Sequence, residues 1–182
     1  MSTRKSTRKT ASRSRRDAIS LLKADHRQVA SWFSSFEKTR SEMRKQQLAT
    51  RICRALKVHT RIEEEIFYPA FLDQAQDEDM HHEAVVEHDA AKKLIAEIAA
   101  ATPTDEYYDA KVTVLSEMIK HHVKEEEQPG GMFAKARKSG MDLAELGRRL
   151  AARKKQLMNS SGSSAPRRSG AQRGTGHAEG RV

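Results

Sequence analysis

The sequence predicts an all-α protein, an up-down-up-down four-helix bundle with a short fifth helix at its C-terminal end. Two observations lead to this prediction. Among 182 residues there are only 9 glycines and 4 prolines, and aromatic residues make up 5%, a composition typical of helical proteins. Between residues 17 and 157, apolar residues also recur at alternating steps of three and four, which is the spacing of the buried stripe on a helix in a bundle.

The first two long helices are predicted near residues 18–40 and 43–74. Each has an apolar stripe that is interrupted by one polar side chain, His26 in the first and His59 in the second. Pro69 lies late in the second segment. Because proline lacks a backbone donor, we expect a kink or an early end there.

The next two long helices are predicted near residues 78–101 and from there through Glu126, with His88 and His122 on their stripes. Thr102 is expected to be the N-cap of the fourth helix. The sequence Thr-Pro-Thr-Asp supports this expectation, because it places proline at the first helical position and an acidic residue at the third.

A shorter fifth helix is predicted beyond the Pro-Gly-Gly break at residues 129–131 and beyond Gly140. Asp142 and Glu145 match the pattern in which an N-cap side chain and an acidic residue three positions later satisfy free backbone donors. We expect this helix to pack outside the bundle or across one end. Its apolar stripe consists of Leu143, Leu146, Leu150 and Leu157.

The formal net charge of +9 is concentrated at the two ends of the chain. Residues 1–16 contain seven basic groups and no acidic group, and residues 158–182 have a net charge of +3, which leaves −1 for residues 17–157. We predict that both ends are disordered, because such segments cannot bury enough apolar surface to fold. Tails of this kind bind phosphate backbones without sequence specificity, or merely aid solubility.

The composition also indicates the cellular context. Cys53 is the only cysteine, so no internal disulfide can form, and a packed free thiol is its expected state. No apolar segment approaches the ~20 residues needed to cross a bilayer, and no apolar export signal follows the arginine pair at residues 15–16. We therefore expect a cytoplasmic protein that is not associated with a membrane.

A histidine lies on the apolar stripe of each of the four long helices, and this pattern indicates chemistry. One buried histidine is commonly a satisfied core residue, but four of them, one per helix, need a common partner. Two are followed four residues later by a glutamate, a spacing that places both side chains on one helix face. The candidate metal ligands are therefore His26, His59, Glu63, His88, His122 and Glu126.

Six ligands of this kind suit a pair of metal ions. If both glutamates bridge and an oxo or hydroxo group completes the bridge, the ions receive about ten of roughly twelve bonds, and positions stay open for a small molecule. Mixed imidazole and carboxylate ligation favours iron over manganese or zinc, and the lack of cysteine ligands disfavours a closed structural zinc site. We predict two iron ions per chain, joined by an oxo or hydroxo bridge.

Several neighbouring residues leave alternatives open. His121 and Glu125 offer a second register with the same spacing, although only His122 lies on the apolar stripe. His81 shares a helix face with the third-helix candidate, and Tyr68 can donate a hydrogen bond, ligate iron or simply pack. Hydrogen-bond partners for the ligand histidines are expected among the adjacent acidic residues Asp25, Glu87 and Asp89.

The order of these residues resembles the hemerythrin-like HHE cation-binding domain. The family pattern is a histidine, then His-x-x-x-Glu, then a histidine, then a second His-x-x-x-Glu. The local sequences LKADH, HTRIEEEIFYPAF, EH and HHVKEEE agree with it, and the resemblance covers about residues 17–157. It implies a non-haem di-iron centre inside a hemerythrin-like bundle, with roles in oxygen or nitric oxide binding, iron handling or peroxide removal.

Two departures from oxygen-carrying hemerythrins argue against reversible oxygen transport. Those proteins have a second histidine four residues before the third-helix ligand, where this chain has Ala84. They also have an aspartate five residues after the last histidine, whereas here Glu126 follows it by four. We therefore expect a di-iron protein that binds or senses a small ligand such as oxygen or nitric oxide. The alternatives are a peroxide-removing oxidoreductase at the same site and a nucleic-acid-associated stress protein that acts through its basic tails.

Overall fold

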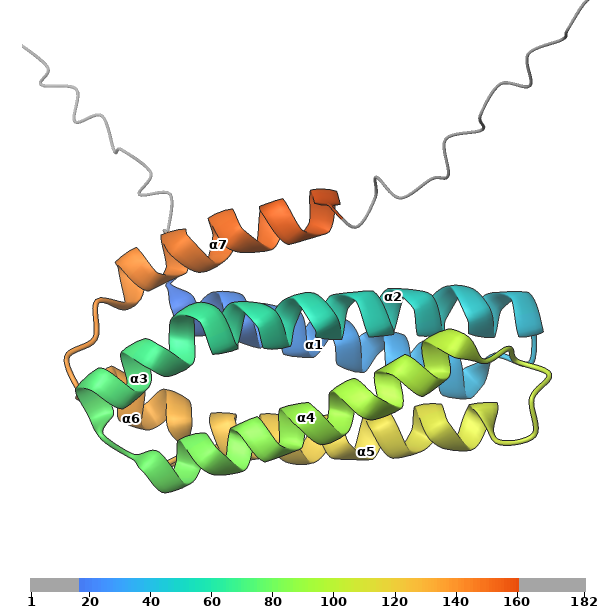
Figure 1. Cartoon of the computed structure of the whole chain (residues 1–182), viewed down its shortest axis with the longest axis horizontal. Coiled ribbons are helices and arrows are strands. Elements are labelled where there is room, and N and C mark those ends of the chain that lie inside the picture. Colours follow the sequence, from blue (N-terminus) through green and yellow to red (C-terminus); the bar gives the residue numbers. More distant parts are fainter. Residues whose placement is uncertain (1–16, 161–182) are drawn as a thin grey trace, which may run out of the picture.

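The computed structural model describes residues 17–160, so the predicted disordered tails lie outside the described residues, apart from residues 158–160. The prediction of disorder is wrong for these three residues, which continue the last helix. All regular secondary structure in the described part is helical, which confirms the predicted fold class (Figure 1). None of these helices is both long and apolar enough to span a membrane. The elements are α1 (Ala18–Lys38), α2 (Glu42–Ile62), the π-helical turn η1 (Glu63–Phe67), α3 (Tyr68–Ala75), α4 (Glu78–Ala100), α5 (Tyr108–Glu127), α6 (Met132–Lys138) and α7 (Leu143–Ser160).

Four long helices form the bundle, with α1 and α2 as one antiparallel pair and α4 and α5 as the other (Figure 1). The short helices α3 and α6 pack together at one end. Helix α7 packs along the outside of α1 and α2, one of the two predicted positions. It spans 18 residues and buries Leu146 and Leu150. As predicted, Asp142 caps it by accepting a hydrogen bond from the N–H of Glu145 (2.9 Å).

The second long helical segment is irregular close to the predicted kink. Helix α2 changes at Glu63 into η1, and the backbone N–H of Tyr68 bonds to the carbonyl of Glu63, five residues back rather than four. Pro69 follows in the first turn of α3, where a missing donor is tolerated. Single π-helical turns inside α-helices are frequent at functional sites. The irregular turn here begins at a candidate metal ligand.

The predicted start of the fourth long helix at Thr102 is wrong. Helix α5 begins at Tyr108, and residues 102–107 form two consecutive turns. These are closed by hydrogen bonds from the N–H of Asp105 to the carbonyl of Thr102 and from the N–H of Tyr108 to the carbonyl of Asp105, both 3.0 Å. The Asp105 carboxylate also accepts a hydrogen bond from the N–H of Thr102 (2.8 Å). Such local side-chain bonding competes with helix formation and holds this segment as turns.

The Pro-Gly-Gly break holds the chain tightly against the end of α5. Gly130 has a left-handed backbone (φ 84°), a conformation that favours glycine. A Cβ atom on Gly131 would lie 2.1 Å from the carbonyl oxygen of Glu125 and 3.0 Å from that of Glu126, so a larger residue would displace this backbone. The seven-residue helix α6 follows and buries Phe133. The sequence did not predict this helix.

The core consists of two apolar clusters, with a layer of buried polar residues between them. One cluster contains residues of α3, α6 and α7, and the other lies toward the connection between α4 and α5. Along α1, for example, Leu22 belongs to the first cluster, Val29 belongs to the second, and His26 lies between them. Close packing on both sides therefore restricts the movement of the polar layer.

Candidate metal centre

The six candidate ligands converge in this polar layer. Each of the four long helices contributes one histidine, and the two glutamates come from η1 and α5. All six residues are buried, with at most 7% of any one exposed. The four helices thus bring together side chains that are as much as one hundred residues apart in the sequence.

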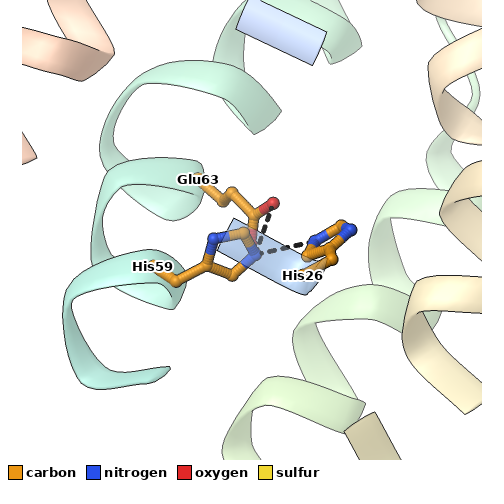
Figure 2. Close-up of side chains that lie close together, drawn as sticks. All are labelled: His26, His59 and Glu63. Carbon is orange, nitrogen blue, oxygen red and sulfur yellow. Dashed lines mark hydrogen bonds and ion pairs between the residues drawn. The ribbon is translucent and has the colours of Figure 1, made fainter. Parts of the chain in front are cut away.

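One half of the cluster joins α1 to α2. Figure 2 shows His59 and Glu63 projecting from successive turns of one helical segment toward His26. The Nε2 atoms of His26 and His59 are 3.0 Å apart, and Nε2 of His59 lies 3.2 Å from Oε1 of Glu63. Three potential metal donors therefore face a common point.

The other half joins α4 to α5. The Nε2 atoms of His88 and His122 are 3.3 Å apart, and Nε2 of His88 is 3.5 Å from Oε2 of Glu63. Glu63 thus presents one carboxylate oxygen to each half. Glu126 also faces both halves, because its Oε2 lies 3.4 Å from Nε2 of His26 and 3.7 Å from Nε2 of His122. Two groups of donors therefore share both carboxylates.

These donors fit a pair of cations. Both carboxylate oxygens of Glu63 and of Glu126 are buried and accept no hydrogen bond from the described residues, an unfavourable state for a carboxylate unless a positive charge lies beside it. Two donors that bind one ion at about 2.1 Å and at right angles would be about 3 Å apart. The paired imidazole nitrogens are separated by 3.0 and 3.3 Å. Cations held between these nitrogens would also meet the carboxylate oxygens of Glu63 and Glu126.

Each imidazole directs its other nitrogen, Nδ1, toward a carboxylate outside the cluster. Nδ1 of His59 faces Asp25 at 3.6 Å, slightly too long for a hydrogen bond. The other three Nδ1 atoms make hydrogen bonds, His26 to Glu127 (2.8 Å), His88 to Glu64 (3.0 Å) and His122 to Glu87 (2.7 Å). A carboxylate on Nδ1 fixes the ring and leaves Nε2 free for a metal ion.

The sequence identified only some of these outer partners. Asp25 and Glu87 face candidate ligands as predicted, but Asp89 instead pairs with Lys92 at the surface (3.1 Å). Glu64 and Glu127 were missed. Each directly follows a candidate ligand within a run of three glutamates, and adjacent helical positions point about 100° apart. The runs of three glutamates could have identified these two partners, because when one glutamate of a run points inward the next can reach a neighbouring helix.

The electrostatics of the cluster favour positive charge beside the two carboxylates. Burial opposes charge on His59 and His122, but the neighbouring glutamates outweigh it and raise the pKa of His59 to about 10 and that of His122 to about 9. Burial and the charge of Glu63 raise the pKa of Glu126, whereas His59, against the effect of burial, lowers the pKa of Glu63. Protons on these groups and bound cations therefore compete for the same positions.

The structure separates the remaining alternatives. His122 is buried in the cluster, whereas the side chain of His121 is 60% exposed. His81 packs edge-on against Tyr68 and, among the described residues, belongs to none of the potential metal-binding groups. Tyr68 is buried beside the cluster. Cys53 is a buried free thiol, and burial raises its pKa to about 11, which is consistent with the predicted packed state.

A buried cluster of imidazoles and carboxylates inside a four-helix bundle is typical of metal-binding bundle proteins. The Hemerythrin HHE cation binding domain matches residues 17–130, and the chain belongs to this family. The resemblance predicted from the sequence is thereby confirmed. The protein is a cation-binding, hemerythrin-like protein.

Two individual proteins are similar to this chain. A crystal structure of a hemerythrin HHE cation binding domain-containing protein from Mycobacterium kansasii matches with a TM-score of 0.67. The match covers 80% of this chain and 89% of that one at 24% identity, and it supports the fold. A protein from Nostoc sp. named DNA nickase is 24% identical over 110 residues, which are 59% of this chain. The chain spans only 30% of the length of that relative.

Replacing His88 by alanine tests the contribution of the α4 histidine. If His88 is a ligand, the His88→Ala variant should bind clearly less metal than the unchanged protein, because one half of the cluster loses a donor. Its helical circular dichroism should stay largely intact. The exposed His82 on the same helix provides the matched control, His82→Ala. Equal metal content in both variants would return His88 to the role of a core histidine.

Proposed function

We propose that the protein is a non-haem di-iron protein that binds or senses a small ligand such as oxygen or nitric oxide. The observation that supports this most is the Glu63 carboxylate, whose two oxygens lie 3.2 Å and 3.5 Å from imidazole nitrogens of opposite halves. A carboxylate in this position suits two ions rather than one. Mixed imidazole and carboxylate donors favour iron. Bound iron would supply exchangeable coordination positions and a change of oxidation state.

The space beside the cluster suits only a very small molecule. A small cavity of about 10 Å³ is lined by the four candidate histidines and by apolar side chains that include Val29, Leu56 and Ile119. This volume is enough for about one water-sized molecule. An outer groove of about 250 Å³ shares His26, Ile119 and Val123 with the cavity. Small movements of Ile119 and Val123 would therefore admit a diatomic molecule and exclude a larger one.

Ligand titration tests the proposal. Iron(II)-loaded protein, titrated with nitric oxide under anaerobic conditions, should show a saturable change in visible absorption with a defined number of ligands per chain. The small volume of the cavity also predicts that a bulky ligand such as a phenyl isocyanide does not bind. No spectral response to nitric oxide in fully loaded protein would contradict the proposal.

Tyr68 is placed to act on a ligand at this site. Tyr68 is 1% exposed, and its hydroxyl lies 3.1 Å from Nε2 of His88, the nitrogen that faces the cluster. A hydroxyl there can donate a hydrogen bond to a bound anion. We expect Tyr68→Phe to retain its iron but to bind azide at least about tenfold more weakly, since a hydrogen bond to a charged partner contributes about 1.5–3 kcal/mol. Azide titration followed by visible absorption measures this, and unchanged affinity would leave Tyr68 a packing role.

Peroxide removal at the same site is a second candidate function. It requires the same iron ligands. Burial raises the pKa of Tyr68 well above its ordinary value, so the phenol keeps its proton and would hold the substrate by a hydrogen bond. Loaded protein that consumes hydrogen peroxide catalytically, over many equivalents per iron, would support this function. Reduced consumption in Tyr68→Phe with unchanged iron content would assign that hydrogen bond to the phenol.

Nucleic-acid association is a third candidate. The net charges of +7 on residues 1–16 and +3 on residues 158–182 favour it. The name of the Nostoc relative, DNA nickase, also favours it, although this chain spans only 30% of that protein. Binding through such tails should weaken steeply with salt. A variant without residues 1–16 and 161–182, which keeps all of α7, should then lose DNA binding. Retained binding would exclude the tails as the cause.

A further inference from the structure

A second group of metal-ligand side chains lies on the surface of the α4–α5 pair. Nε2 of His121 is 3.4 Å from Oε1 of Glu87 and 3.2 Å from Oε1 of Glu125, and the three donor atoms lie within 4.8 Å of one another. His121 and Glu125 occupy one face of α5 at a four-residue spacing, and Glu87 approaches from α4. The side chains are 60%, 30% and 21% exposed, so water has access to this group.

This outer group is connected to the buried cluster by a shared residue. While Oε1 of Glu87 faces His121, its Oε2 accepts a hydrogen bond from Nδ1 of His122 (2.7 Å). His122 in turn directs Nε2 toward Glu126. A single carboxylate therefore separates the surface group from a candidate ligand of the inner site.

A cavity also leads from the outer group to the buried cluster. It has a volume of about 80 Å³, and its lining includes Glu87 and Glu125 at the surface and His122 and Glu126 in the interior. Glu126 is only 2% exposed, and neither of its oxygens accepts a hydrogen bond within residues 17–160. Exposed Glu83 adds a further carboxylate, and no lysine or arginine is among the residues that line this cavity. A path lined by carboxylates attracts cations inward.

We propose that Glu87, His121 and Glu125 bind a divalent first-row transition cation, and that this surface site passes the ion through the cavity to Glu126. The imidazole donor favours iron(II), manganese(II) or zinc over magnesium and calcium. Three protein donors leave the remaining coordination positions to water, so the ion is held weakly and exchanges readily. The inner cluster, with six candidate ligand side chains that include the buried carboxylate of Glu126, then competes for it. The transfer step rests on the proposed function, whereas the surface site does not.

The test uses a double variant of the outer group, His121→Ala with Glu125→Gln, and His82→Ala as the matched control. Glu87 is left unchanged because it also orients His122. Metal-free full-length protein is mixed anaerobically with iron(II), and uptake is stopped at intervals with a strong iron(II) chelator. The double variant should load at least about tenfold more slowly and reach the same final iron content, since the six inner donors are intact. The control should load at the rate of the unchanged protein.

A second measurement examines the surface site alone. Manganese(II) is titrated into each protein, and the free ion is measured by electron paramagnetic resonance. The unchanged protein and the control should each bind one weakly held ion, and the double variant should not bind this ion. Equal manganese binding in all three proteins would overturn the surface site. Equal iron-loading rates would overturn the transfer path. If no protein took up iron at the inner cluster, the proposed function would fail, and the manganese titration would still decide the surface site.

Discussion

Replacing Glu63 by glutamine should reduce the iron bound by each chain from about two ions to less than one. Glu63 is fully buried and presents one oxygen to each half of the cluster. Glutamine keeps the shape of the side chain but replaces one of its two oxygens with an NH2 group and removes the negative charge. One half therefore loses an oxygen donor, and both halves lose the charge that they share. Among the candidate ligands, only Glu126 should give a similar loss, because its Oε2 also faces both halves.

The measurement is the iron content of Glu63→Gln after anaerobic loading and gel filtration. Glu117→Gln is the matched control, because Glu117 is an exposed glutamate on α5. The control should retain its iron. The helical circular dichroism of Glu63→Gln should also be retained, because the amide removes a buried charge rather than apolar packing. A Glu63→Gln variant that folds and still holds both ions would show that Glu63 is not shared between them.

Removing the metal should lower the melting temperature strongly at neutral pH and much less near pH 5. An ion that binds only the folded state stabilises it by about 4 kcal/mol at a thousandfold excess over its dissociation constant. For a chain of this size, that corresponds to a decrease of roughly 8–16 °C on chelation. Two ions that bind together would give a decrease at or above the upper end of this range.

The dependence on pH follows from the two raised histidines. In the folded protein the pKa of His59 is about 10 and that of His122 about 9, against an ordinary value of 6.5. The stability that their protonated forms contribute is fully present below pH 6.5 and is lost as pH rises through 9 to 10. Metal must displace these protons, so its stabilising effect should be small near pH 5, clear at pH 7 and still increasing above it. Thermal unfolding with and without a chelator near pH 5, at pH 7 and above pH 7 checks this. An equal change in melting temperature at all of these pH values would contradict the assignment of these ligands.

Much of the fold could be predicted because its long helices carry regular apolar stripes. The stripe on α1 passes through His26, and the structure buries that face as the spacing indicates. The start of α5 could not be placed, because the Asp105 side chain bonds to the N–H of Thr102 equally well in a turn and in a helix cap. Helix α6 is seven residues long and too short for a periodic signal.

The candidate ligands could be named from the sequence because the four histidines lie on apolar stripes and the two glutamates follow at a four-residue spacing, but their arrangement could not. Spacing places His59 and Glu63 on one face, yet only the packing of the helices shows that Glu63 also reaches His88. For the same reason, Glu64 and Glu127 could not be recognised as partners of Nδ1 atoms. Glu64 contacts a histidine 24 residues away in the sequence, and Glu127 contacts one 101 residues away.

The proposal that one buried cluster holds two iron ions is tested most directly by the metal content and absorption spectrum of aerobically purified protein. We expect about two iron ions per chain, with the near-ultraviolet absorption of a bridged ferric pair, and the loss of both in Glu63→Gln. A single ion per chain, or zinc without such absorption, in protein whose six candidate ligands are intact would contradict it.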